Sequence, residues 1–223
     1  KFNDGSDISL YQYTLDTAFD ISSKNAGSEE KLALNPAGDP ISNQTDDITF
    51  NNDGTKLFAI SDNGAMNIHI LSTPYDISDA TLVADDGINW RTYKEPWGSS
   101  NTTMLPQTIR FNNDGTKMYL TEAVINTTDP QESVGVVQYN LATPFVPSST
   151  TTVQVLNLRA QFPKTNIAIH AMNFDDDGTR MYVSAGNFLL KTDHPHAVYE
   201  LSIPFEISSA KHVGTFNFVN ASG

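Results

Sequence analysis

The 223-residue chain contains no cysteine, which excludes a disulfide scaffold, thiolate metal ligands and cysteine-based catalysis. Cations are also scarce, because 13 Lys and Arg residues stand against 26 Asp and Glu residues and give a net charge of −13. Nucleic acid and anionic membrane surfaces are bound mainly by clustered cations, so both are disfavoured as partners. No apolar run approaches the ~20 residues that a membrane-spanning helix needs.

Motifs for catalysis and cofactor binding are missing as well. The sequence holds no Gly-x-Ser-x-Gly elbow, no His-Glu-x-x-His zinc motif, no phosphate loop and no dinucleotide fingerprint. We therefore expect no cofactor.

What the sequence does contain is repetition. One motif reads Phe-Asx-Asx-Asp-Gly-Thr followed by Lys or Arg, an apolar residue and an aromatic residue, and its copies lie at residues 50–58, 111–119 and 174–182. A second motif begins with Leu and has an aromatic residue four positions later, and its copies lie at residues 15–22, 71–78, 141–148 and 201–208. The two motifs alternate with a period of roughly 60 residues, which indicates a repeat architecture.

Both motifs predict β structure. Asp-Gly between short apolar stretches is a hairpin signal, because Gly adopts positive φ at little cost. Apolar residues alternate after the glycine as they do in a strand. The Pro found in most copies of the second motif marks a turn between two further strands. No segment keeps a 3.6-residue apolar period, so we expect an all-β chain with little helix.

Four antiparallel strands repeated every ~60 residues predict a β-propeller, in which each four-stranded sheet is one blade. We label the strands of a blade a to d from the axis outward. The expected blades are a partial one with strands c and d only, then three complete ones, at residues 8–34, 46–84, 108–158 and 168–219. A β-sandwich is the alternative, but it does not explain why two motifs recur in a fixed order.

The hairpin motif resembles the Phe-x-x-Asp-Gly-Thr-Lys-apolar-aromatic hairpin of WD40-like propeller repeats of the TolB and YVTN type. The second motif, which reads Tyr-Asp-Ile-Ser at residues 75–78, is similar to a repeat of large bacterial secreted proteins and of virion proteins of aquatic phages. The resemblance covers most of residues 8–219. It implies the propeller fold and an extracellular or virion-surface location, but it carries over no catalytic residue, because the group shares none.

About three and a half blades are expected, whereas propellers typically close with 4–8 blades. An open propeller would expose strand edges and half of a core. We therefore expect these residues to be part of a longer polypeptide, or the ring to be completed by another chain. A four-bladed ring is disfavoured, since the sequence holds no fourth Asp-Gly-Thr hairpin.

The variable insertions fall in the b–c and d–a connections, which share one side of a propeller, here called the loop face. They are residues 35–45, 85–107, 122–135, 159–167 and 185–196. Binding residues concentrate on loops that a rigid scaffold holds. The candidate ligand-binding residues are Trp90, Arg91, Tyr93 and Trp97, because such groups stack on sugars or anchor protein contacts. The alternative is that both tryptophans pack the loop over the disc.

Asp193, His194 and His196 form a candidate metal site, because residues two apart in an extended segment share a side. The alternative is that these imidazoles are solvated or locally hydrogen-bonded, since the sequence identifies no further ligand. His170 could line the central channel. The acidic stretch before Gly178 lacks the spacing of an EF-hand, so we expect it to be a turn.

These observations favour a non-enzymatic propeller that serves as a structural or adhesive binding module of an extracellular or virion assembly, such as a tail or fibre. Its partner would be a protein or a glycan on the loop face. The alternative is a propeller enzyme, a lactonase-like or glycan-cleaving hydrolase. Such an enzyme would need carboxylates or imidazoles from at least three blades to converge on the axis.

Overall fold

The computed structural model describes residues 8–34, 45–61, 63–85, 88–90, 102–126, 134–162, 167–187 and 194–217. The strands in these ranges are β1 (Ser9–Gln12), β2 (Glu30–Ala33), β3 (Asp47–Phe50), β4 (Lys56–Ile60), β5 (Met66–Ile70), β6 (Thr81–Asp85), β7 (Thr102–Phe111), β8 (Lys117–Asn126), β9 (Val134–Leu141), β10 (Thr150–Asn157), β11 (Ile167–Phe174), β12 (Arg180–Asn187), β13 (Pro195–Leu201) and β14 (Ala210–Asn217).

Helix in the described ranges is limited to short 3-10 turns. They are η1 (Ile21–Ser23), η2 (Ala26–Ser28), η3 (Ile77–Asp79), η4 (Pro147–Ser149) and η5 (Ile207–Ser209). None of the helices in this part of the chain is long and apolar enough to cross a membrane.

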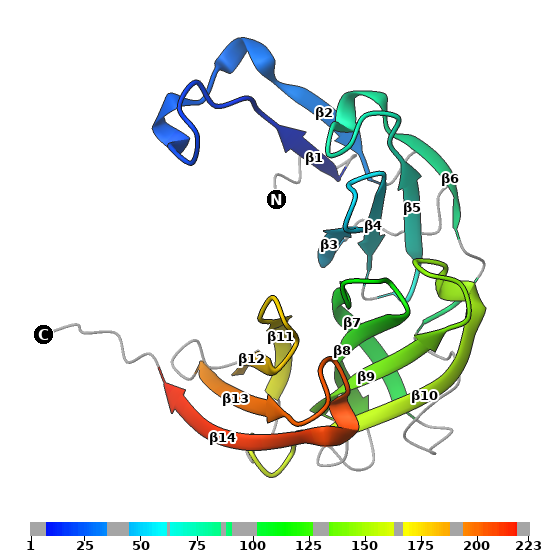
Figure 1. Cartoon of the computed structure of the whole chain (residues 1–223), viewed down its shortest axis with the longest axis vertical. Coiled ribbons are helices and arrows are strands. Elements are labelled where there is room, and N and C mark those ends of the chain that lie inside the picture. Colours follow the sequence, from blue (N-terminus) through cyan, green and yellow to red (C-terminus); the bar gives the residue numbers. More distant parts are fainter. Residues whose placement is uncertain are drawn as a thin grey trace, which may run out of the picture.

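The strands form antiparallel sheets in chain order. One sheet pairs β1 with β2, and the other three have the orders β3-β4-β5-β6, β7-β8-β9-β10 and β11-β12-β13-β14. Figure 1 shows the sheets following one another along an open arc, with β3, β7 and β11 on its inner side and β6, β10 and β14 on its outer side. The fold is that of a β-propeller, and the all-β architecture expected from the sequence is confirmed.

Three strands run further than the repeat pattern indicates. β7 begins at Thr102 instead of near residue 108, and β8 and β12 continue to Asn126 and Asn187, into segments expected to be loops. β7 pairs with β8 along this whole length, with a register shift between Pro106 and Thr108. A bulge of this kind tolerates a proline, which lacks the N–H that a regular ladder uses.

Each hydrophobic core lies between two neighbouring sheets. In β4, Leu57 and Ala59 belong to the core shared with the first sheet, whereas Phe58 and Ile60 belong to the core shared with the third. A further core, which includes Tyr119, joins the third sheet to the fourth. Because side chains alternate along a strand, a strand within the arc must be apolar on both faces.

The a–b and c–d turns meet on one side of each blade, here called the clasp face. In the three complete blades the ring of a c–d aromatic residue covers the glycine of the a–b turn; the pairs are Tyr75 with Gly54, Phe145 with Gly115, and Phe205 with Gly178. The N–H of each aromatic residue donates to the carbonyl of its glycine at 2.9 Å. All three glycines have φ of 71°, and the aromatic residues have φ of 61°, 55° and 58°, a left-handed conformation that bulky residues rarely adopt.

The turn before each glycine is closed by its own side chains. Asp177 Oδ1 accepts hydrogen bonds from the backbone N–H and the hydroxyl of Thr179, at 3.0 and 2.6 Å. Asp53 and Asp114 accept from the corresponding threonines in the same way. These hydrogen bonds lower the pKa of all three aspartates. The acidic stretch before Gly178 is therefore a turn, as expected.

Candidate functional site

Most of the loop face lies outside the described residues. Its b–c and d–a connections include segments 35–44, 86–87, 91–101, 127–133, 163–166 and 188–193, none of which is described. Arg91, Tyr93, Trp97 and Asp193 fall in these segments, so their part in binding stays a prediction. The described candidates are Trp90, His170, His194 and His196.

Trp90 is fully buried in the core between the second and third sheets. Its ring meets Tyr139 edge-on, with 5.2 Å between the ring centroids. Its backbone N–H donates to the carbonyl of Gly64 at 2.8 Å, which ties the d–a connection to the b–c turn. The expectation that this ring contacts a ligand at the surface is not met, because neighbouring sheets bury a large aromatic group more favourably than water solvates it. Trp90 follows the packing alternative.

Imidazoles gather at the loop-face end of the fourth sheet. His170 lies in β11 at a bulge, where the register with β12 shifts between Ile169 and Ala171, and bulges re-aim side chains. A Cβ built on Gly186 would lie 2.9 Å from Cδ2 of His170 and 3.2 Å from Nδ1 of His194. The missing side chain of Gly186 therefore makes room for both imidazoles.

These imidazoles influence one another electrostatically. Burial lowers the pKa of His170 and the charge of His194 lowers it further, while a hydrogen bond with the Gly186 backbone opposes the shift. Burial and then the charge of His194 also lower the pKa of His196. His170 and His196 thus favour the neutral form, in which an imidazole can accept a hydrogen bond or a proton.

His196 contacts a hydroxyl group. Its Nδ1 lies 2.7 Å from Oγ of Ser184, the residue opposite it in the β12–β13 ladder, and its ring stacks on Phe216. A hydroxyl next to an imidazole is the first element of a nucleophile and base pair. These groups all come from one sheet, whereas the criterion set from the sequence asks for groups from at least three blades.

The described residues contain no cluster of three or more His, Cys, Asp or Glu side chains that could hold a metal ion. His194 and His196 are therefore described without a third ligand, and Asp193 lies outside the described ranges. The metal site stays a prediction.

Sequence reasoning missed the hydrogen bonds between neighbouring blades. Gln12 Oε1 accepts from the backbone N–H of Ile77 at 2.9 Å, and Gln138 Oε1 accepts from Ile207 at 3.0 Å. The signal was present in the repeats, since each glutamine lies three residues before the leucine of the second motif. Ser184 was also missed, and for it no sequence signal existed, because only the sheet brings it opposite an imidazole.

No protein-family model and no curated protein sequence matches the chain. Among solved structures, the chain is similar to the crystal structure of the Cps50 (Swd1) beta-propeller domain of Myceliophteria thermophila. The two are 11% identical with a TM-score of 0.47, and the match covers 85% of this chain and 49% of that one. The chain thus spans about half the length of the domain that it matches.

Proposed function

We propose that the chain is a non-enzymatic binding module, a structural or adhesive part of an extracellular or virion assembly. The β-propeller fold supports a binding role in general terms. The resemblance of the repeats to TolB and YVTN-type propellers, secreted bacterial proteins and phage virion proteins supports the location. The net charge of −13 favours a protein or glycan partner over nucleic acid.

The observation that carries the proposal is the difference between the two faces. On the clasp face of the three complete blades, the aspartate before each glycine accepts hydrogen bonds within its own turn, and an aromatic ring covers each glycine. On the loop face, the connections differ in length and composition from blade to blade. Turns that are occupied by their own contacts offer little to a partner, so we assign the binding of a protein or glycan partner to the loop face and to Arg91, Tyr93 and Trp97.

The test replaces residues 91–101 with a Gly-Ser segment of equal length and compares binding to glycan arrays and to candidate host cells. The matched control is Ile203→Ser, which changes an exposed apolar residue on the clasp face. We expect the loop replacement to weaken binding at least ~10-fold and the control to leave it unchanged. Binding that survives the loop replacement but is lost in the control would place the site on the other face.

A hydrolase is the second candidate, and the contact of 2.7 Å between Ser184 Oγ and His196 Nδ1 favours it. Lactone and glycoside panels test this candidate with purified protein. Turnover that disappears in Ser184→Ala and in His196→Ala, but persists in His212→Ala, would establish the enzyme and remove the proposal of a purely binding role.

A further inference from the structure

In the three complete blades, the c–d aromatic residue and the a–b turn glycine beneath its ring form a contact that we call the clasp. The first sheet has the aromatic residue of a clasp, but no a–b hairpin is described beneath it. Phe19 occupies the position of Tyr75, Phe145 and Phe205 in the second motif, and its φ of 63° matches theirs. Its side chain, however, is 101% exposed. Within the described residues, β1 pairs only with β2, and no Asp-Gly turn lies under the ring.

The other blades show what this clasp fits. In each, a glycine with φ of 71° sits beneath the ring, and its carbonyl accepts the N–H of the aromatic residue at 2.9 Å. The N–H of Phe19 has no such acceptor among the described residues. A bulky residue held in the left-handed region is strained unless surrounding contacts compensate it, and here the contact seen in the other three clasps is missing.

The second sheet also lacks an aromatic contact that the missing hairpin would supply. Phe58 of β4 packs on Phe111 with 4.6 Å between centroids, and Tyr119 of β8 packs on Phe174 with 4.7 Å. The equivalent ring is Phe50 of β3, which has an aromatic neighbour in its own blade, Tyr75, at 5.3 Å. No ring from the preceding sheet reaches Phe50 in the described part of the chain.

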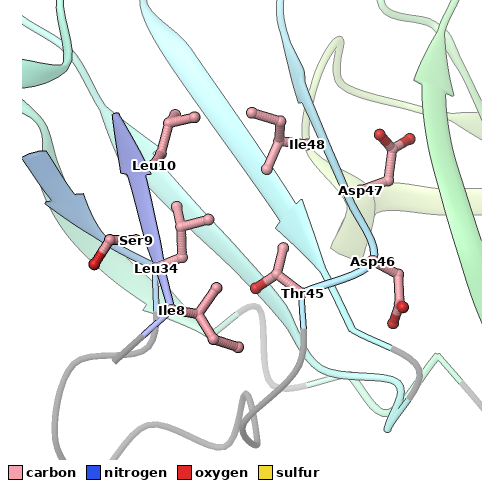
Figure 2. Close-up of a pocket in the computed structure, with 8 residues that line it drawn as sticks. All are labelled: Ile8, Ser9, Leu10, Leu34, Thr45, Asp46, Asp47 and Ile48. Atoms are coloured by element: carbon pink, nitrogen blue, oxygen red, sulfur yellow. The ribbon is translucent and has the colours of Figure 1, made fainter. Parts of the chain in front are cut away.

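A cleft of about 250 Å³ lies between the start of β1 and the start of β3, and neither Phe19 nor Phe50 lines it. Its lining residues are Ile8, Ser9, Leu10, Leu34, Thr45, Asp46, Asp47 and Ile48. Figure 2 shows Leu10, Leu34 and Ile48 directed into the space between the two strands. Ile48 is half-buried, whereas the equivalent residues Ile109 and Met172 are almost fully buried. The cleft is the place that strand b fills in the complete blades.

We propose that this cleft and Phe19 together bind a β-hairpin that lies outside residues 1–223 and carries an Asx-x-Asp-Gly-Thr-Lys-apolar-aromatic turn. The Phe19 ring covers the glycine of this hairpin, and the carbonyl of that glycine accepts a hydrogen bond from the Phe19 N–H. The second strand of the hairpin pairs with the free edge of β1, and its aromatic residue packs on Phe50.

The second sheet also offers hydrogen-bond acceptors for the lysine of such a hairpin. Lys117 Nζ lies 3.2 Å from the carbonyl oxygen of Phe205 and 2.8 Å from Glu206 Oε2, both in the clasp of the next blade. The equivalent groups of the second sheet are the Asp76 carboxylate and the Tyr75 carbonyl, and this carbonyl also accepts a hydrogen bond from Gln12 Nε2 at 2.7 Å. A cation there would complete the pattern of the third and fourth sheets.

A second copy of the chain does not supply the hairpin. Each of its Asp-Gly-Thr turns is already covered by the aromatic residue of its own blade, at Gly54, Gly115 and Gly178. Releasing one would expose the same kind of clasp that it fills. The occupant is therefore a hairpin that no other clasp of this chain holds.

The test uses the whole chain and a fluorescent peptide copy of residues 107–121. A disulfide between added terminal cysteines closes the peptide, because a preorganised hairpin loses less entropy on binding. The matched peptide carries Gly115→Ala. The matched proteins are Phe19→Ala and Ile203→Ala, the latter an exposed apolar residue on a filled clasp. Readouts are fluorescence anisotropy and hydrogen exchange of the β1 amides.

We expect saturable binding that slows exchange in β1, is unchanged in Ile203→Ala, and weakens at least ~10-fold with either Phe19→Ala or the Gly115→Ala peptide. Three results would overturn the proposal: no binding up to ~1 mM peptide, equal binding by Phe19→Ala, or a Phe19-dependent dimer of the chain alone in analytical ultracentrifugation.

Discussion

The ring of Phe205 lies so close to Gly178 that a Cβ on the glycine would come within 2.2 Å of Cδ2 of the ring. The glycine also has φ of 71°, where L residues with a Cβ are strained. Space and backbone conformation therefore demand glycine at the same position. The Phe145 and Gly115 pair repeats the relationship.

Gly178→Ala should destabilise the fold by about 2–4 kcal/mol, from left-handed strain together with displacement of the ring. Gly214→Ala is the matched control, since a Cβ there meets nothing within 4 Å, and we expect it to change stability by less than ~1 kcal/mol. Urea unfolding followed by circular dichroism measures both. Equal losses of stability in the two variants would show that the contact between Gly178 and Phe205 does not stabilise the fold.

Acidification should weaken the contact between the third and fourth sheets through Glu206. Burial alone would raise the pKa of this carboxyl, but hydrogen bonds from Lys117, Gln138 and Ser208 and the charge of Lys117 lower its pKa to about 2. The folded pKa lies below the unfolded value of ~4.3. The stabilisation is therefore complete above the unfolded pKa and is lost as the pH falls toward the folded one.

Glu206→Gln should remove this part of the pH dependence, on the order of 1–3 kcal/mol between pH 6 and 2. Free energies of unfolding across that range test the expectation. Glu200→Gln is the control, because Glu200 is exposed and lies 3.6 Å from an exposed Arg180. If Glu206→Gln keeps the slope of the unmodified protein, the carboxylate contributes no acid-sensitive stabilisation.

The histidines predict a second pH effect at milder acidity. The folded pKa of His170 is lowered by burial and by His194, so stability that is present above the unfolded pKa of ~6.5 is lost as the pH falls through the folded pKa. His194→Ala should raise the pKa of His170 and that of His196 together, as measured by NMR titration of the ring protons. His212→Ala should leave both titrations where they are. A shift in only one ring would contradict a shared interaction with His194.

Trp90 predicts a spectroscopic result. In a Trp97→Phe variant only Trp90 remains, and because its ring is fully buried, its emission should be blue-shifted and protected from iodide. Trp90→Ala should cost about 3–5 kcal/mol, as expected for a large buried aromatic residue. Emission that iodide quenches as readily as free tryptophan would show that the indole is exposed.

The sequence predicted the architecture because its signals are local. Asp-Gly with a following threonine specifies a turn by itself, and the alternation around it specifies strands, so the hairpin at Gly115 could be placed without coordinates. The left-handed backbone of Phe145 could not be predicted. An aromatic residue avoids that conformation unless a tertiary contact compensates it.

The clustering of the histidine side chains could not be predicted from the sequence, for a related reason. His170 and His194 both lie over Gly186, although they belong to different parts of the sheet, and a bulge beside His170 sets its direction. Sequence patterns register neither a bulge nor the space left by a missing side chain in a neighbouring strand. Trp90 shows the opposite case, in which composition suggested a binding residue and burial decided for packing.

The amides at the second position of the hairpin turns give the row of blades a direction. The side-chain amide of Asn52 donates to the carbonyl of Asn113, and the amide of Asn113 donates to the carbonyl of Asp176 at 2.8 Å. At Asp176 the chemistry reverses, because a carboxylate accepts but does not donate. A group that packs against the fourth sheet at Asp176 must therefore bring an N–H or a positive charge. The two ends of the row of blades thus favour neighbours of different chemistry.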